Sequence, residues 1–262
     1  MAALLRFEFR KLFRNKAFYI CLGIALFLLI INIITTKVLF DALGEDLADM
    51  TEQMKTTMLS SFTGLSLLKT SFTNNTITII GVVVAIITCE DFALDTIKNI
   101  YSKGYSRSQC YFAKLLSSFV AFLIITISGM IISFTLGSLL LDGVGTAGKN
   151  YILSIICIFL IALSFFMIFY AVSILLKKMA ASIVLCVIGP TALLLLFVMA
   201  DAFIDSDKFA ISDYWIGGGL LTNLGLYDVE MKFIIATLII APITIGAFFL
   251  LSFFLNNKKD VK

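Results

Sequence analysis

Residues 151–176 read YILSIICIFLIALSFFMIFYAVSILL, and this stretch contains no charged side chain. A helix that crosses the hydrocarbon core of a bilayer needs about 20 mostly apolar residues. Because lipid offers the backbone no hydrogen-bond partners, such a stretch has to be helical. A strand of a membrane barrel would instead alternate apolar and polar residues. The stretch therefore predicts a transmembrane helix.

Five further stretches have the same character, and the composition of the whole chain agrees with them. Of the 262 residues, 60% are hydrophobic and only 14% are charged, whereas roughly 25% are charged in an ordinary soluble domain. We therefore expect an all-α integral membrane protein in which residues 1–262 form a single domain with six transmembrane helices. The other five helices are expected at Ala17–Leu39, Leu65–Cys89, Tyr111–Leu141, Ala180–Ala200 and Phe233–Leu255.

The lysine and arginine residues indicate how these helices are oriented. If the N-terminus lies inside and the helices alternate, most of the basic residues fall inside, within 1–16, 90–114, 177–178 and 258–262. Short loops rich in lysine and arginine stay in the cytoplasm. The pattern predicts a multi-pass protein of the cell membrane with both termini in the cytoplasm. The net charge of +3 gives no reason to expect a nucleic-acid partner.

Residues 1–16 are expected to form an amphipathic helix on the membrane surface. At helical spacing Leu5, Phe9, Leu12 and Phe13 share one face, and arginines at every fourth position form a neighbouring basic stripe. Such a helix places rings at the acyl boundary and arginines against anionic headgroups. The alternative is a simple basic flank of the first span. Membrane lipids are thus an expected partner, and the expected interface residues are Arg6, Phe9, Arg10, Phe13 and Arg14.

Residues 90–108, between the second and third spans, read EDFALDTIKNIYSKGYSRS. Acidic side chains come first and basic ones follow, with apolar side chains such as Leu94 and Ile97 between them. Apolar groups rimmed by charge are typical of a docking surface. Gly104 is suited to end a short helix before the chain returns to the membrane. We expect a short cytoplasmic helix that binds another protein.

This part of the chain resembles the ABC-2 type transporter permeases. The resemblance lies in an acidic residue followed by Thr96-Ile97-Lys98-Asn99, then Ser102-Lys103-Gly104-Tyr105-Ser106-Arg107, then Lys114, and in Glu8-Phe9-Arg10-Lys11 and Arg14-Asn15-Lys16 near the start. The length and the six-helix plan agree as well, while the family often has glycine in place of Asp95. In that family this loop is a coupling helix that fits into a groove of a separate ATP-hydrolysing subunit. The resemblance implies a coupling surface made of Glu90, Asp91, Asp95, Thr96, Lys98, Lys103 and Arg107.

The resemblance also implies partners. A separate ABC ATPase subunit, carrying ATP and Mg, and a second permease copy or a homologous permease would complete the transporter. The chain itself would be a non-catalytic permease subunit without catalytic, cofactor-binding or metal-binding residues. Two features of the sequence agree. It has no histidine, the commonest general base and metal ligand. The phosphate-loop-like stretch Gly143–Lys149 is followed by Asn150 rather than the required serine or threonine.

The expected transport path is apolar. The spans contain almost no ionisable residues, which argues against an ion-coupled transporter. An apolar path favours an amphiphilic cargo, and the analogy with small permeases favours export of a peptide, with Asn74, Asn75 and Thr78 near the outer mouth. Cargo, direction of transport, and homodimer or heterodimer stay open. The alternative function is a membrane scaffold or sensor whose loop recruits a cytoplasmic partner.

Two further features concern packing. Gly129, Ser133 and Gly137 recur at every fourth position and allow close helix approach. The approach can occur within one subunit or between two, and we expect it within one. The extracellular loop 201–231 carries Trp215 among acidic residues. This loop either lies along the outer membrane interface, where aromatic rings settle, or is a solvated connector.

Overall fold

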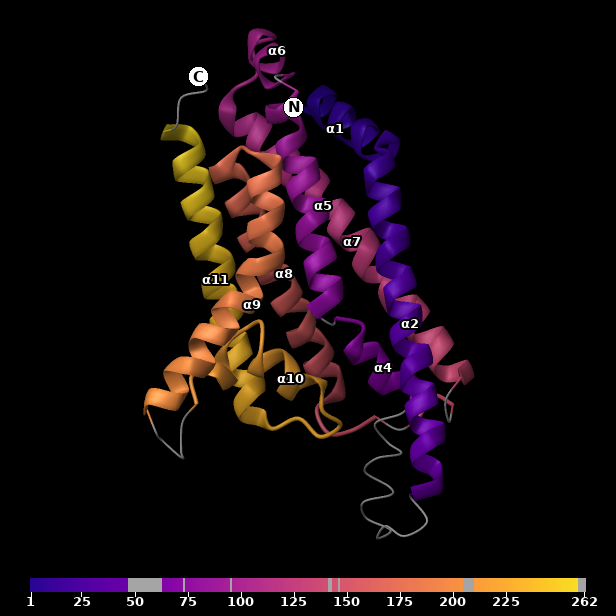
Figure 1. Ribbon diagram of the computed structural model, residues 1–262. Coiled ribbons are helices and arrows are strands. Elements are labelled where there is room, and N and C mark those ends of the chain that lie inside the picture. Colours follow the sequence, from indigo (N-terminus) through magenta and orange to yellow (C-terminus); the bar gives the residue numbers. More distant parts are fainter. Residues whose placement is uncertain are drawn as a thin grey trace.

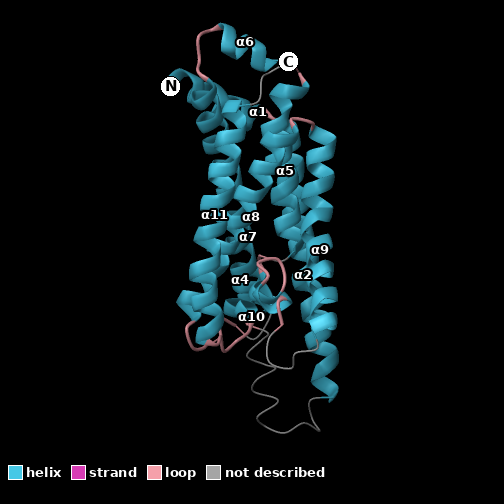
Figure 2. Cartoon of the chain, turned by 90° about the vertical axis from the view of Figure 1, so that its left-hand side faces the viewer, coloured by secondary structure: helices cyan, strands magenta, loops and turns pink. Residues whose placement is uncertain are grey.

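A computed structural model of the protein describes residues 1–46, 63–72, 74–94, 96–140, 143–145, 147–204 and 210–258. Within these ranges every regular element is a helix, and the long helices run side by side as a bundle (Figures 1 and 2). In the dry core of a bilayer each backbone N–H and C=O has to find its partner within the segment, and the helix meets that requirement.

Six helices in the described part of the chain are long and apolar enough to cross a membrane. They confirm the predicted all-α fold and make the chain a multi-pass membrane protein. The fourth predicted span coincides with α8 at both ends. The six are α2 (Lys16–Asp46), α5 (Asn74–Ala93), α7 (Arg107–Leu140), α8 (Tyr151–Leu176), α9 (Met179–Ile204) and α11 (Met231–Lys258).

The shorter helices lie at the two ends of the bundle (Figure 1). At one end are α1 (Ala2–Arg14), α6 (Thr96–Ser102) and the last turns of α11, and we call it the α6 end. At the opposite end, the α10 end, are α4 (Gly64–Thr70) and α10 (Gly219–Gly225), with the short helix η2 (Ser212–Tyr214) preceding α10 in the chain. The chain thus starts its first crossing and ends its last one at the same end, as an even number of crossings requires.

The second predicted span, Leu65–Cys89, was wrong as a single helix. The structure ends α4 at Thr70 and begins α5 at Asn74, so the crossing helix is shorter than expected. The Ser71 hydroxyl donates a hydrogen bond to the carbonyl of Leu68 (2.7 Å). A serine that bonds the backbone in this way competes with the helical ladder. The apolar run before the break forms α4, a separate short helix that packs against α7.

The predicted stripe of small residues on α7 packs within one subunit, as expected. Gly129, Ser133 and Gly137 are all buried. A Cβ atom on Gly137 would lie 3.1 Å from Cα of Gly64 in α4, and one on Gly129 would lie 3.6 Å from Leu29 in α2. The stripe therefore lets α4 and α2 approach α7 closely.

α8 forms the centre of the bundle, and most of its aromatic side chains are buried. Phe166 and Tyr170 pack against Phe122 and Tyr111 of α7. The Tyr170 hydroxyl donates a hydrogen bond to the carbonyl of Tyr111 (2.8 Å), and the Tyr111 hydroxyl shares one with Ser252 of α11 (2.7 Å). By contrast α9 leaves most of its apolar side chains exposed, as expected for a helix that faces lipid or another membrane helix.

The described part of the 201–231 loop is packed against the bundle and is not a solvated connector. Leu220 and Leu224 of α10 are fully buried in the main core. The Trp215 ring lies 5.0 Å from the ring of Phe197 in α9. The Asp201 carboxylate accepts hydrogen bonds from the backbone at the start of η2, which fixes where the loop turns back. This segment therefore caps the α10 end of the bundle.

Candidate functional site

α6 is a short helix that ends in a tight turn, as the sequence predicts. Gly104 has φ +85°, a conformation that favours glycine, and its N–H donates to the carbonyl of Tyr101 (2.9 Å). Ser106 and Gln109 then cap the start of α7 reciprocally, because the backbone N–H of each residue donates to the other's side chain (3.1 and 3.3 Å). The turn at Gly104 and the cap at the start of α7 together set the direction in which the chain re-enters the bundle.

The inner face of α6 is apolar and packs on two neighbouring helices. Ile97 and Ile100 are buried. Ile100 belongs to a small apolar cluster with Leu4 of α1 and with Cys110 and Ala113 of α7. This cluster is separate from the main core of the bundle. α6 is therefore seated on α1 and α7 rather than attached to α5 alone.

The outer side of the α6 region is open to solvent. Leu94, just before α6, has 63% of its surface exposed, and the predicted coupling residues Lys98 and Lys103 are exposed too. An exposed leucine beside lysines is suited to binding a protein partner. Of the other predicted coupling residues, Arg107 is half-buried, and Asp95 lies outside the described residues.

A buried carboxylate lies directly beneath α6. Asp91, near the end of α5, forms ion pairs with Lys11 of α1 and with Lys114 of α7. Its Oδ1 also accepts a hydrogen bond from the hydroxyl of Thr96, the first residue of α6 (2.9 Å). We call Asp91, Lys11, Lys114 and Thr96 the Asp91 cluster. Two residues predicted to be on the coupling surface, Asp91 and Thr96, thus join α6 to α1, α5 and α7 from the inside.

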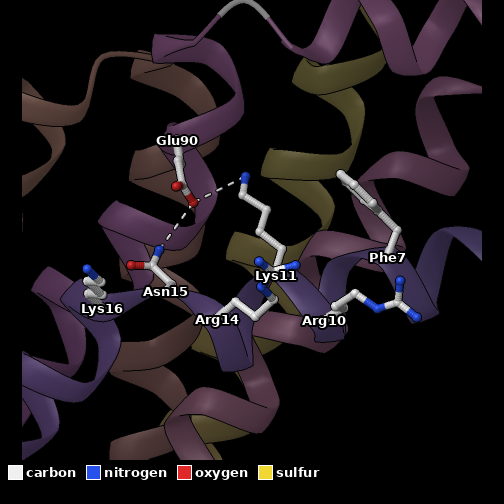
Figure 3. Close-up of a pocket in the computed structure, with 7 residues that line it drawn as sticks. All are labelled: Phe7, Arg10, Lys11, Arg14, Asn15, Lys16 and Glu90. Atoms are coloured by element: carbon white, nitrogen blue, oxygen red, sulfur yellow. Dashed lines mark hydrogen bonds and ion pairs between the residues drawn. The ribbon is translucent and has the colours of Figure 1, made fainter.

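Glu90 fixes the corner between α1 and α2 (Figure 3). Its Oε2 accepts hydrogen bonds from Nζ of Lys11 and from the side-chain amide of Asn15, both at 3.2 Å. Asn15 is the single residue between α1 and α2, and its Oδ1 accepts the backbone N–H of Ala17 (2.9 Å). The angle at which α1 leaves the first span is therefore tied to the end of α5.

Two titratable groups of α1 are perturbed by this site. Glu8 is buried, with 3% of its surface exposed, and burial raises the pKa of its carboxyl, although the charge of Lys114 acts in the opposite direction. Burial alone would lower the pKa of Lys11. The hydrogen bonds to Asp91 and Glu90 and the charges of these two carboxylates together outweigh that effect, so the pKa of Lys11 is raised. Lys11 therefore keeps its charge and its attraction to Asp91.

Phe92 connects the Asp91 cluster to the turn between α8 and α9. The Nζ atoms of Lys114 and Lys177 lie 5.6 and 5.5 Å from the centroid of its ring. Both distances are within the range of cation–π attraction. The α8–α9 turn therefore lies at the α6 end, beside the residues that hold α6.

The predicted apolar face of α1 is divided in the structure. Leu4, Glu8 and Leu12 form the buried face, which points into the bundle. Phe13 is half exposed, on the outside. Helical spacing groups Leu12 with Phe13, but the bundle covers only Leu12. Of the other predicted interface residues, Phe9 is half-buried, and the exposed ones are Arg6, Arg10 and Arg14.

The predicted path residues lie at the start of α5, toward the α10 end. Thr78 is half-buried and lines a hollow of about 20 Å³ with Pro190 and Leu194 of α9. A volume of that size holds about one water molecule, so the hollow has no room for a cargo in this conformation. Asn74 and Asn75 begin α5, and their side chains lie outside the described residues.

The sequence-based site omitted Glu8, Lys11 and Lys114, although these residues surround Asp91. Lys114 offered one signal, because a lone lysine in an apolar span requires a counter-charge. Lys11 and Asp91 are 80 positions apart in the sequence. No local pattern pairs residues at such a distance.

The fold and this end of the molecule define a class: a multi-pass α-helical membrane protein with a short exposed helix seated on buried ion pairs between its second and third spans. A family model described as ABC-2 family transporter protein matches residues 4–193, which include α1, α6 and the Asp91 cluster. The chain belongs to this ABC-2 transporter family. Proteins of the family are membrane components of transporters, generally non-catalytic, that normally work with an ABC ATPase. Searches of the curated proteins and of the solved structures each found no match.

Proposed function

We propose that this chain is the transmembrane subunit of an ATP-driven transporter and that a separate ABC ATPase binds and moves it through α6. The observation that carries the proposal is the two-sided environment of α6. Leu94, Lys98 and Lys103 are exposed for a partner, while the Asp91 cluster ties the other side to α1, α5 and α7. A force on α6 would therefore reach three helices.

The proposal places the α6 end, with both termini, in the cytoplasm of the cell. Support comes from the basic residues, since those of α1, α6, the α8–α9 turn and the end of α11 all lie at this end. In this orientation α1 lies at the cytoplasmic membrane surface with its arginines toward solvent and headgroups. α10 and the 201–231 loop then face the exterior.

In the proposed cycle, ATP and Mg on two ATPase subunits draw the subunits together. The α6 helices of two permease chains, either identical or homologous, follow. Within each chain the Asp91 ion pairs keep α1, α5 and α7 moving as a unit with α6. Because the hollow beside Thr78 is nearly closed, these helices have to shift before cargo passes the α10 end.

For the cargo we propose an amphiphilic molecule such as a hydrophobic peptide, moved outward. Support comes from the inner surfaces of the spans, which are dominated by phenylalanine and isoleucine. An apolar path of this kind solvates ions poorly and accepts apolar groups. A peptide with apolar side chains matches that chemistry.

The test is a charge reversal on the exposed side of α6. The double variant Leu94→Asp/Lys103→Glu is expected to lower the affinity for the ATPase about tenfold or more, because it replaces an apolar contact and reverses a charge. The measurements are co-purification of the ATPase and its stimulation in proteoliposomes. Lys149→Glu is the control for the charge reversal, since Lys149 is exposed and stands just before α8, which starts at the α10 end.

Two results would count against the proposal. Unchanged ATPase binding in the double variant would remove α6 as the docking element. Purification of the native protein without any nucleotide-hydrolysing partner would favour a membrane scaffold or sensor instead.

A further inference from the structure

A basic hollow opens between the second half of α1, the α1–α2 corner and the end of α5 (Figure 3). Its volume is about 480 Å³. A phosphate group with part of a glycerol backbone fits in this space. The hollow lies beside the Asp91 cluster, because Lys11 and Glu90 belong to its wall.

The charge of this hollow is strongly unbalanced. Arg10, Lys11, Arg14 and Lys16 line it, against the single carboxylate of Glu90. Lys11 already holds Glu90 and Asp91. No carboxylate of the described residues pairs with Arg10, Arg14 or Lys16, and all three are exposed. Arg10, Arg14 and Lys16 therefore line the hollow without a carboxylate partner among the described residues, an arrangement that suits a phosphate.

The surroundings distinguish a lipid phosphate from a soluble one. α2 starts at Lys16 in the wall of the hollow and continues directly into the first span. Tyr19, whose hydroxyl donates to the carbonyl of Phe13 (3.1 Å), and the following residue, Ile20, are both exposed. Exposed aromatic and apolar side chains at the end of a span mark the level of the headgroups. A phosphate in the hollow would thus have room for acyl chains along α2.

We propose that this hollow binds the phosphate of an anionic phospholipid from the membrane leaflet at the α6 end. Arg10 and Arg14 bind the phosphate oxygens, Lys16 adds a third positive charge, and the acyl chains lie against Tyr19 and Ile20 of α2. The lipid fixes the α1–α2 corner. Because α1 also carries Lys11, a lipid bound in the hollow keeps Lys11 paired with Asp91. It thereby stabilises the position of α6 on the Asp91 cluster. The site does not depend on whether an ATPase binds α6.

The test compares two variants that each lose two positive charges. Arg10→Gln/Arg14→Gln removes the phosphate ligands. Lys149→Gln/Lys178→Gln is the control, since both residues are exposed and neither lines the hollow. Binding of phosphatidylglycerol and phosphatidylcholine to each purified protein is measured by native mass spectrometry and by the shift in thermal unfolding midpoint on adding lipid.

We expect the wild-type protein and the control to retain phosphatidylglycerol in preference to phosphatidylcholine. The Arg10→Gln/Arg14→Gln variant should bind phosphatidylglycerol about tenfold more weakly or worse, since charge-assisted hydrogen bonds are lost. Arg10→Lys/Arg14→Lys should recover part of the binding, which shows that the loss is not due to misfolding.

Three outcomes would overturn the proposal. An equal loss of phosphatidylglycerol in the control would reveal diffuse surface attraction rather than a site. Displacement of the lipid by inorganic phosphate at comparable concentration would make the site one for a soluble anion. Unchanged lipid binding in Arg10→Gln/Arg14→Gln, with loss of a protein partner, would assign the hollow to that partner.

Discussion

Lys114 at the α6 end and Lys69 at the α10 end are both buried, with 1% and 3% of their surfaces exposed. The protein holds them in different ways. Lys114 pairs with the Asp91 carboxylate. Lys69 donates a hydrogen bond to the carbonyl of Leu226 (2.8 Å) and lies 5.1 Å above the ring of Tyr151. Among the described residues Lys69 forms no ion pair.

The two lysines thus differ in charge balance. A carboxylate neutralises Lys114, whereas Lys69 is held by an uncharged carbonyl and an aromatic ring. Removing one partner of a buried ion pair leaves an uncompensated charge in the interior, which is strongly destabilising. Removing a lysine that is held by a carbonyl and a ring leaves only a polar carbonyl behind. Burial lowers the pKa of Lys69, with only a partial opposing effect of Asp228. Lys114 is therefore held by a matched charge, whereas Lys69 is held by one hydrogen bond and an aromatic ring.

The largest expected effect comes from removing the shared carboxylate at the α6 end. Asp91→Asn leaves Lys114 without its counter-charge and Lys11 with Glu90 alone, and it should lower the free energy of unfolding by about 3–5 kcal/mol. Thermal unfolding midpoints of the purified protein in detergent measure the change. Adding Lys114→Met to the variant should restore part of the loss. A loss no larger than that of Lys69→Met would show that the two ends are held alike.

A smaller effect is expected from overpacking the contact between α4 and α7. In Gly137→Ala the new methyl group would lie 3.0 Å from Cδ1 of Leu67 and 3.1 Å from Cα of Gly64. Such crowding should cost about 1–3 kcal/mol. Gly246→Ala in α11 is the matched control, because no atom lies within 4 Å of its new Cβ. Equal midpoints for the two variants would mean that α4 moves aside freely.

The contacts of Lys69 at the α10 end should contribute less to the free energy of unfolding than the ion pairs of Asp91 do. Lys69→Met removes one charge-assisted hydrogen bond, but it also removes a buried charge and keeps an apolar chain of similar length. The expected net loss is about 1 kcal/mol in the free energy of unfolding. Protection of the backbone amides of α4 from hydrogen exchange measures the local part of this loss. A cost close to that of Asp91→Asn would contradict the comparison.

The smallest expected effect is a pH dependence at the α6 end. The pKa of Glu8 is raised by burial, so the folded protein binds this proton more tightly than the unfolded chain does. Its contribution to stability is present at acidic pH and is lost as the pH rises from the usual glutamate range through the raised pKa. Unfolding midpoints followed from acidic to neutral pH should fall less in Glu8→Gln than in wild type. Parallel curves would refute the role of Glu8.

The sequence predicted the α6 region well because its signals are local. Gly104 ends α6 and Ser106 begins α7 through contacts within a few residues. The break before α5 was missed because the apolar run before Lys69 and the one after Thr76 were joined across the polar residues between them. The sequence also failed to predict that Leu12 of α1 is buried while Phe13 is exposed. Helical spacing places Leu12 and Phe13 on one face, but only the neighbouring helices determine which of the two is covered.

The residue pattern was enough to assign a lipid environment, six crossings and the expected side of the basic segments. Long uncharged runs such as 151–176 allow only lipid-embedded helices, whatever their neighbours. The position of Asp91, buried between Lys11 and Lys114, became known from the packing of the helices. Which charges meet depends on how α1, α5 and α7 pack, because a buried carboxylate is stable only where that packing brings cations to it.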